Sequence, residues 1–162
     1  MITPDNILTE ARLWVGTPYR HQARGPIGPE GGVDCVGLLI VVSQALGLIG
    51  NDYDPTGYDW ETDGSQLQEE LSKWAECIAS SSGGFSSLDW EESGQLRPGD
   101  IVVMRIVGLP QHTGIISEID YSGLKVSGLI HAYNVEKRVV EHRLDDRWAK
   151  RIIQVWRLKE GL

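Results

Sequence analysis

The apolar pattern of the chain changes its period near residue 100, and this change limits the folds that the sequence can adopt. Before that point, apolar residues such as Ile7, Ala11 and Trp14 recur at helical spacing. After it, short runs of β-branched residues alternate with turn signals, as they do in the strands of an antiparallel sheet. Helices followed by antiparallel strands predict an α+β domain, with N-terminal helices packed on a C-terminal antiparallel β-sheet.

Caps and breakers indicate where each element begins and ends. Helices are expected at residues 4–15, 35–46, 67–78 and 145–151, and strands at residues 101–107, 113–119, 125–133, 138–144 and 152–158. Thr3 followed by Pro4 is typical of a helix start. Residues 20–34 are polar and rich in glycine, which predicts a loop, and residues 120–123 predict a hairpin turn.

The bulk properties fit one domain spanning residues 1–162, with 41% apolar and 23% charged residues. A formal net charge of −8 argues against a nucleic-acid-binding surface. Cys35 and Cys77 are too few for a disulfide framework. No secretory signal is recognisable at the start, and the longest apolar run, residues 36–42, is too short to cross a bilayer. We therefore expect a chain that is cytoplasmic when synthesised and has no membrane partner.

Cys35 lies where a polar, glycine-bearing segment meets the apolar run 36–42. Asp34 is a favoured N-cap, so we expect the helix to begin at Cys35 and to hold the thiol in its first turn. The unpaired N–H groups and the helix dipole stabilise an anion at that position. This is expected to lower the pKa of the thiol and to make Cys35 more reactive than Cys77. The alternative is a small buried hydrophobe in a core helix.

Two histidines, His112 and His131, lie downstream of Cys35 in expected strands that we predict to be neighbours. A cysteine on a helix N-terminus and histidines from a later sheet are the groups that a cysteine–histidine peptidase requires. The alternative is that both histidines are structural, and His21 and His142 receive only that interpretation. The spacing of the cysteines and histidines does not fit a structural zinc site, so neither a metal nor another cofactor is expected.

Five short motifs occur in a fixed order along nearly the whole chain. They are Gly16-Thr17-Pro18-Tyr19, Asp34-Cys35-Val36-Gly37-Leu38, Arg97-Pro98-Gly99-Asp100-Ile101, His112-Thr113-Gly114-Ile115 and Ile130-His131-Ala132. Together they resemble the NlpC-type (NlpC and p-sixty) cell-wall peptidases, which have a papain-like core. Residues 17–23 are most similar to the branch found in prophages, tailed phages and gene-transfer agents. For that branch the resemblance implies tail proteins as partners and a chain carried in a phage-like particle.

The resemblance also implies roles for the matched residues. Cys35 would be the nucleophile, His112 the general base and later acid, and His131 the group that orients His112. The expected substrate-binding residues are Tyr19, Asp34 and Val36. The family often has serine where this chain has Val36, which leaves a preference for a free substrate amine open. The segment at about 49–96 is long for a minimal domain and is expected to be an acidic insertion that walls the groove or docks to another protein.

The activity implied by the resemblance is cysteine-dependent hydrolysis of peptidoglycan stem peptides. The expected target is the γ-D-glutamyl–diaminopimelate bond, cleaved through a thioester acyl-enzyme. One alternative is a structural phage-tail or assembly component with weak turnover. Another is an amidase or acyltransferase that uses the same three residues. The joint presence of Cys35, His112 and His131 favours an enzyme, although fold by itself does not decide function.

Overall fold

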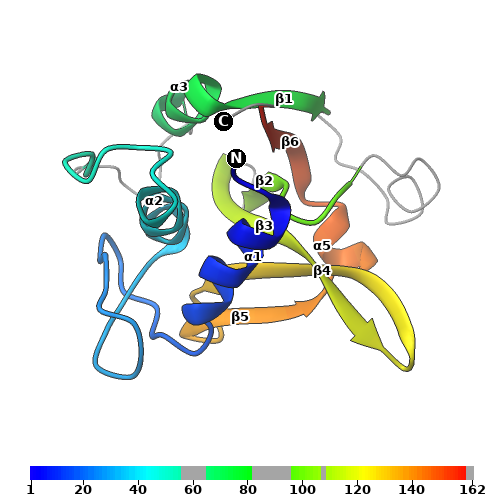
Figure 1. Ribbon diagram of the computed structural model, residues 1–162. Helices are drawn as coiled ribbons and strands as arrows, with labels where there is room; N and C mark the ends of the chain where they lie inside the picture. Colours follow the sequence, from blue (N-terminus) through cyan, green and yellow to red (C-terminus); the bar gives the residue numbers. More distant parts are fainter. Residues whose placement is uncertain (56–64, 82–95, 107–108, 160–162) are drawn as a thin grey trace.

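The computed structural model describes residues 1–55, 65–81, 96–106 and 109–159, which form an antiparallel sheet flanked by helices (Figure 1). The sheet has six strands in the order β1-β6-β2-β3-β4-β5, and every neighbouring pair is antiparallel. The strands are β1 (Ala75–Ser80), β2 (Ile101–Ile106), β3 (Leu109–Tyr121), β4 (Leu124–Tyr133), β5 (Arg138–Arg143) and β6 (Ile152–Leu158). The expected α+β class is confirmed.

The described helices are α1 (Pro4–Leu13), α2 (Cys35–Ala45), α3 (Ser65–Trp74) and the short α5 (Asp146–Ala149). Thr3 is the N-cap of α1, as the sequence predicts, and it also forms a capping box with Asn6. Buried residues of α1, α2 and α3 pack in one core with one face of the sheet, whereas Trp148 and Ala149 of α5 pack with the opposite face. No helix in the described ranges is long and apolar enough to cross a membrane.

The two faces of the sheet are distinguished by the alternation of side chains along β3 and β4. Ile115 and Ile130, which are opposite each other in the ladder, belong to the core shared with α1 and α2. Ile116 and Leu129, one position further on, belong to the core that contains Trp148. Because successive residues of a strand point to opposite faces, this alternation also decides which way the strand histidines point.

Two expected elements differ from the structure by more than a shift of one or two residues at an end. The third helix was expected to reach residue 78, but it ends at Trp74 and the next residues form β1. The free edge of β6 explains this, because Ala75 and Cys77 pair with Leu158 and Trp156 and tertiary pairing overrides a helical pattern. Strand β3 begins at Leu109, earlier than expected, because the ladder to β2 extends that far.

The described parts of the segment 49–96 are attached to the rest of the molecule. Near its start, Arg24 of the loop 20–34 pairs with Asp54 at 3.1 Å and donates to the carbonyl of Pro55 at 3.3 Å. Further on, Leu71 and Trp74 are buried in the core shared with α2. The expected groove wall or docking function falls mainly on residues 56–64 and 82–95, which lie outside the described residues.

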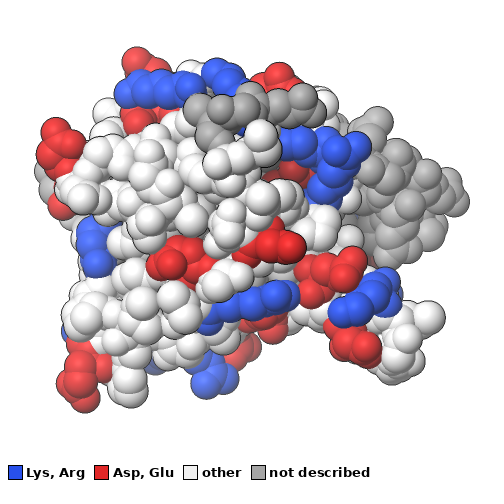
Figure 2. Space-filling view, in the orientation of Figure 1, with Lys and Arg blue, Asp and Glu red and all other residues white. Residues whose placement is uncertain are grey.

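Charged side chains of both signs are interspersed on the face of the molecule seen in Figure 2. Acidic residues outnumber basic ones, 23 to 15, in the whole sequence.

Candidate active site

The N-terminus of α2 holds Cys35 as its first residue, as the sequence predicts. Asp34 is the N-cap, and its carboxylate accepts a 2.7 Å hydrogen bond from the N–H of Gly37. The same carboxylate accepts a 2.6 Å bond from the N–H of Gln22 and lies 3.5 Å from Nδ1 of His21. The Asp34 side chain is therefore engaged with groups that fold the loop 20–34 against the start of the helix.

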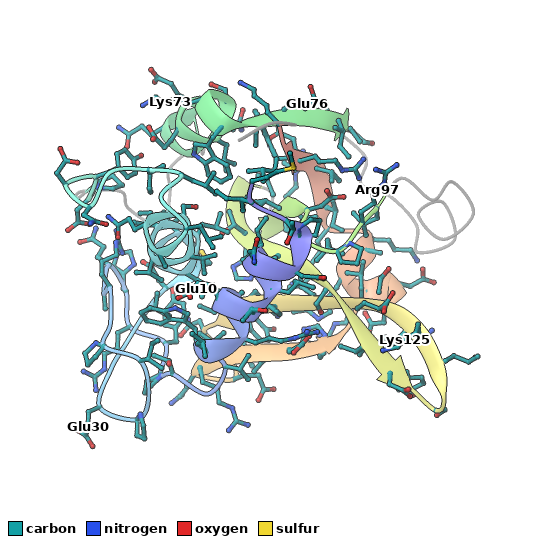
Figure 3. The ribbon with its side chains drawn as sticks, in the orientation of Figure 1. Glu10, Glu30, Lys73, Glu76, Arg97 and Lys125 are labelled. Atoms are coloured by element: carbon teal, nitrogen blue, oxygen red, sulfur yellow. The ribbon has the colours of Figure 1, made fainter. Side chains whose placement is uncertain are left out.

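Gly37 is required by the closeness of that loop. A β-carbon at position 37 would lie 2.6 Å from the carbonyl oxygen of Ala23 and 2.9 Å from Oδ1 of Asp34. Since the first of these is a backbone atom, it has little freedom to move away. The glycine of the Asp-Cys-x-Gly motif thus lets the loop cross over the first turn of α2. Figure 3 shows Glu30 at the outer end of this loop.

Burial has the largest effect on the pKa of the Cys35 thiol. The residue is 8% exposed, and burial together with the negative charge of Asp34 raises the pKa of the thiol to about 11. Hydrogen bonds from Thr113 and from the N–H of Val36 act in the opposite direction but do not offset the burial. The expectation that the helix start lowers the pKa is therefore wrong for this state, because loss of solvation outweighs the helix N-terminus.

Thr113 joins α2 to β3. Its hydroxyl donates a 2.9 Å hydrogen bond to the carbonyl of Cys35, and its N–H contacts the Cys35 thiol. That N–H belongs to the peptide unit between His112 and Thr113, so the thiol lies against the main chain of His112. The Thr113 hydroxyl faces α2, and the ring of His112 lies 6.3 and 6.0 Å from the rings of Tyr133 and Trp148.

His112 and His131 are brought together by the pairing of β3 with β4, which confirms that their strands are neighbours. Nε2 of His112 lies 2.6 Å from Nδ1 of His131, and both residues are buried. Gly114 leaves the space for this arrangement, because a β-carbon there would lie 3.2 Å from the β-carbon of His131 and 2.7 Å from Cδ1 of Leu129. The His-x-Gly spacing of the motif thus has a packing cause.

His142, which was expected to be only a structural histidine, continues the contact. Its Nε2 lies 2.9 Å from Nε2 of His131, and its Nδ1 lies 2.8 Å from the carbonyl oxygen of Arg143. In the β4–β5 ladder His142 is opposite Leu129, two residues from His131 on the same face. Only the register of β4 on β5 reveals that His142 lies beside His131, and no local sequence pattern predicts that register.

Burial also determines the charge of the histidine pair. It lowers the pKa of both His112 and His131, and the positive charge of Arg151 lowers them further. His131 also lies edge-on to Trp148 and stacks on Tyr133, with ring centroids 4.6 and 5.2 Å away. Both imidazoles are therefore neutral in the resting protein, and so is the thiol.

The expected substrate-binding residues surround the same helix end. Tyr19 is half-buried, and burial followed by the charges of Cys35 and Asp34 raises the pKa of its hydroxyl. Its main chain is fixed by a 2.8 Å bond to the carbonyl of Lys137. Val36 lies in the first turn of α2 and is partly exposed. Within the described residues, no group of acidic, cysteine or histidine side chains is arranged to hold a metal ion.

Solved structures share this architecture. The NlpC/p60 domain of the peptidoglycan hydrolase SagA matches with a TM-score of 0.55 at 18% sequence identity, covering 97% of this chain and 100% of that one. Two structures of an N-acetylmuramoyl-L-alanine amidase from Bacteroides uniformis match with TM-scores of 0.57 and 0.58 at 15% and 16% identity, covering 97% of this chain and 99% of theirs. No protein-family model matches the sequence, and no curated protein is significantly similar to it.

The chain therefore has the papain-like α+β fold of NlpC/p60 domains, as the sequence motifs predicted. At these identities the likeness establishes the fold alone, and function must be argued from the site.

Proposed function

We propose that this protein is a cysteine-dependent cell-wall hydrolase that cleaves amide bonds in peptidoglycan. The observation that supports this most is the junction of α2 and β3, where the Cys35 thiol contacts Thr113 and the preceding residue, His112, is 2.6 Å from His131. The likeness in fold to a peptidoglycan hydrolase and to an N-acetylmuramoyl-L-alanine amidase supports the same class of substrate.

In the first half of the reaction, Sγ of Cys35 attacks the carbonyl carbon of the scissile amide while His112 takes the thiol proton. The main-chain N–H of Cys35 at the start of α2 stabilises the oxyanion. His112 then gives the proton to the leaving amine, the C–N bond breaks and a thioester remains. In the second half, His112 takes a proton from water and the resulting hydroxide adds to the thioester. The C–S bond then breaks, the product leaves as a carboxylic acid, and His112 returns the proton to Sγ of Cys35.

The neutral resting state has a consequence for this mechanism. Since burial raises the pKa of Cys35 and lowers that of His112, the thiolate–imidazolium pair is disfavoured before substrate binds. Proton transfer is therefore coupled to the attack on the carbonyl. Substrate binding supplies the electrophile and the oxyanion contact that make the transfer favourable.

The proposed target is the γ-D-glutamyl–diaminopimelate bond of the stem peptide. In this proposal Tyr19, whose hydroxyl is influenced by the charges of Cys35 and Asp34, contacts the substrate on the amino-terminal side of the scissile bond. We assign Asp34 an indirect role, since it is 1% exposed and holds Gly37 and Gln22. Val36 brings an apolar side chain to the helix start where a hydroxyl would hold an amine.

The likeness to an N-acetylmuramoyl-L-alanine amidase favours one second candidate, cleavage between the glycan and the stem peptide. The same groups would perform it, because both bonds are amides. Digestion of purified peptidoglycan followed by mass spectrometry separates the two. New amino termini on diaminopimelate indicate the endopeptidase. Intact stem peptides whose L-alanine carries a free amino terminus indicate the amidase.

The matched variants for this experiment are Cys35→Ala and Cys77→Ser. Cys35→Ala is expected to abolish fragment release, whereas Cys77→Ser, which changes the exposed cysteine of β1, is expected to release fragments at the wild-type rate. Release by Cys35→Ala, or no release by the wild type, would refute the proposed function. In the latter case the remaining candidate is a structural component with little turnover.

We extend the proposal to delivery by a phage-like particle, on the resemblance of residues 17–23 to the phage and gene-transfer-agent branch. Co-sedimentation of the protein with purified particles from an induced culture tests this part. Its absence from particles that carry tail proteins would exclude such delivery without affecting the enzymatic proposal.

A further inference from the structure

Three histidines from three consecutive strands form a hydrogen-bonded chain that ends on a main-chain carbonyl. The distances are 2.6 Å from His112 to His131, 2.9 Å from His131 to His142 and 2.8 Å from His142 to the oxygen of Arg143. We propose that His142 is a positioning residue, which sets the direction of this chain and thereby holds His112 in the tautomer whose Nδ1 accepts a proton. The proposal rests on the function of His112 as general base.

The direction of the chain follows from its last member. A carbonyl oxygen only accepts hydrogen bonds, so Nδ1 of His142 carries a proton and donates it to Arg143. In neutral imidazole the other nitrogen is then an acceptor. Nε2 of His142 therefore accepts, and the nitrogen that faces it, Nε2 of His131, is the donor.

The same reasoning carries through to His112. With its proton on Nε2, neutral His131 has an unprotonated Nδ1, which accepts from Nε2–H of His112. Nδ1 of His112 is then left with a lone pair. A general base needs such a nitrogen, and the opposite tautomer would carry a proton there.

The reverse direction is unfavourable at the carbonyl end. It would require Nε2 of His142 to carry the proton, which places the lone pair of Nδ1 against the oxygen of Arg143 at 2.8 Å. Two acceptors at that distance repel each other, and this end of the chain of histidines would lose its hydrogen bond to the carbonyl. One direction of the chain is thus preferred, although all three imidazoles are chemically alike.

The surroundings hold the rings in place and keep His112 and His131 neutral. His131 has 0% exposure and packs against both Tyr133 and Trp148. The Trp148 ring is also 6.0 Å from His112 and 5.5 Å from His142. The guanidinium of Arg151 lies 4.8 Å over the Trp148 ring, and its charge disfavours protonation of His112 and His131. The titratable groups facing His131 are therefore the other two histidines, Tyr133 and this arginine.

Nitrogen-15 NMR of the histidine side chains tests the proposal without turnover, because the two ring nitrogens report which of them carries the proton. In the wild type near neutral pH, we expect Nδ1–H on His142 and Nε2–H on both His131 and His112. Nδ1–H on His112 as the main form in the folded wild type would overturn the proposal.

Two substitutions at position 142 test causation. His142→Gln keeps a side-chain oxygen that accepts from His131, whereas His142→Phe keeps a ring and removes the acceptor. In His142→Phe we expect a mixture of His112 tautomers and a kcat lowered about tenfold with KM nearly unchanged, the scale set by one lost hydrogen bond. His142→Gln is expected to restore the single tautomer and most of kcat.

Glu141→Gln is the matched control. Glu141 is the neighbour of His142 on β5 and pairs with Arg12 of α1 at 2.9 Å, so this variant loosens the same strand without touching the chain of histidines. It is expected to keep the wild-type tautomers and kcat. Equal losses in His142→Gln and His142→Phe with unchanged tautomers would overturn the proposal. Wild-type tautomers as expected but no hydrolysis would instead refute the proposed function and leave the chain of histidines standing.

Discussion

The hydroxyl of Thr113 donates a 2.9 Å hydrogen bond to the carbonyl of Cys35, the first residue of α2. This bond joins the strand that carries His112 to the helix that carries the thiol, at the point where the two elements meet. Thr113 directly follows His112 in β3, so the main chain of His112 is held beside the Cys35 thiol. The residue after the histidine therefore anchors the helix, and the histidine itself is left to contact His131.

Thr113→Val tests this anchor with a side chain of nearly the same shape. The carbonyl of Cys35 loses a buried donor, so we expect the protein to be destabilised by roughly 1 kcal/mol. We also expect kcat to fall more than KM rises, because the thiol loses a contact that orients it. Thermal unfolding and steady-state kinetics measure the two effects. An unchanged kcat would show that Thr113 is not needed to position Cys35.

The two cysteines are expected to react with an alkylating agent in the opposite order from the one predicted from the sequence. Cys35 is buried with a thiol pKa of about 11, whereas Cys77 is exposed on β1. Because the thiolate is the reactive form, iodoacetamide near neutral pH is expected to label Cys77 first and Cys35 slowly. Peptide mapping over time, with Cys77→Ser as control, measures both rates. Faster labelling of Cys35 would mean that its thiolate is already populated without substrate.

The two histidines of the proposed catalytic site are expected to differ in importance. His112 exchanges protons with the reacting groups, whereas His131 acts on His112 through one hydrogen bond. His112→Ala is expected to lower kcat by about 10² to 10⁴, the usual range for loss of a general base. His131→Asn retains a hydrogen-bonding side chain, so its kcat is expected to fall less than that of His112→Ala. If kcat falls more in His131→Asn than in His112→Ala, the two roles are exchanged.

Val36→Ser is expected to change substrate preference on the amino-terminal side. The wild type has no hydroxyl at this position of the first turn, so matched peptides with free and acetylated amino termini should give similar kcat/KM values. The serine variant is expected to favour the free amine about three- to tenfold, the value of one hydrogen bond. A strong preference for the free amine in the wild type would show that other groups form the amine site.

Acid is expected to destabilise the fold through the buried histidines. The pKa of His131 is lowered in the folded protein from its ordinary 6.5, mainly by burial. The unfolded chain therefore binds more protons below that pH. The neutral ring stabilises the folded protein fully above pH 6.5. This stabilisation is lost as the pH falls towards the pKa of His131 in the folded state. The Tm of the wild type should fall between about pH 7.5 and pH 5, and His131→Asn should show a smaller fall. Parallel pH dependences would exclude His131 as the cause.

The order of elements could be predicted from the sequence because the relevant signals are local. Thr3 and Asp34 cap α1 and α2 as expected, and the hairpin of residues 120–123 forms with positive φ at Ser122 and Gly123. The positions of Cys35, His112 and His131 at a helix start and on neighbouring strands followed from the same kind of pattern. Each of these features depends on residues within a few positions of one another.

The tertiary structure decided what depends on packing between distant segments. Burial of Cys35 at the junction of α2 and β3 reversed the expected direction of its pKa shift, because desolvation exceeds the effect of the helix end. The free edge of β6 turned residues 75–80 from an expected helix into β1. The register of β4 on β5 brought His142 to His131, which no local pattern indicates. Local preferences thus specify the elements, whereas solvation and register arise only when those elements pack together.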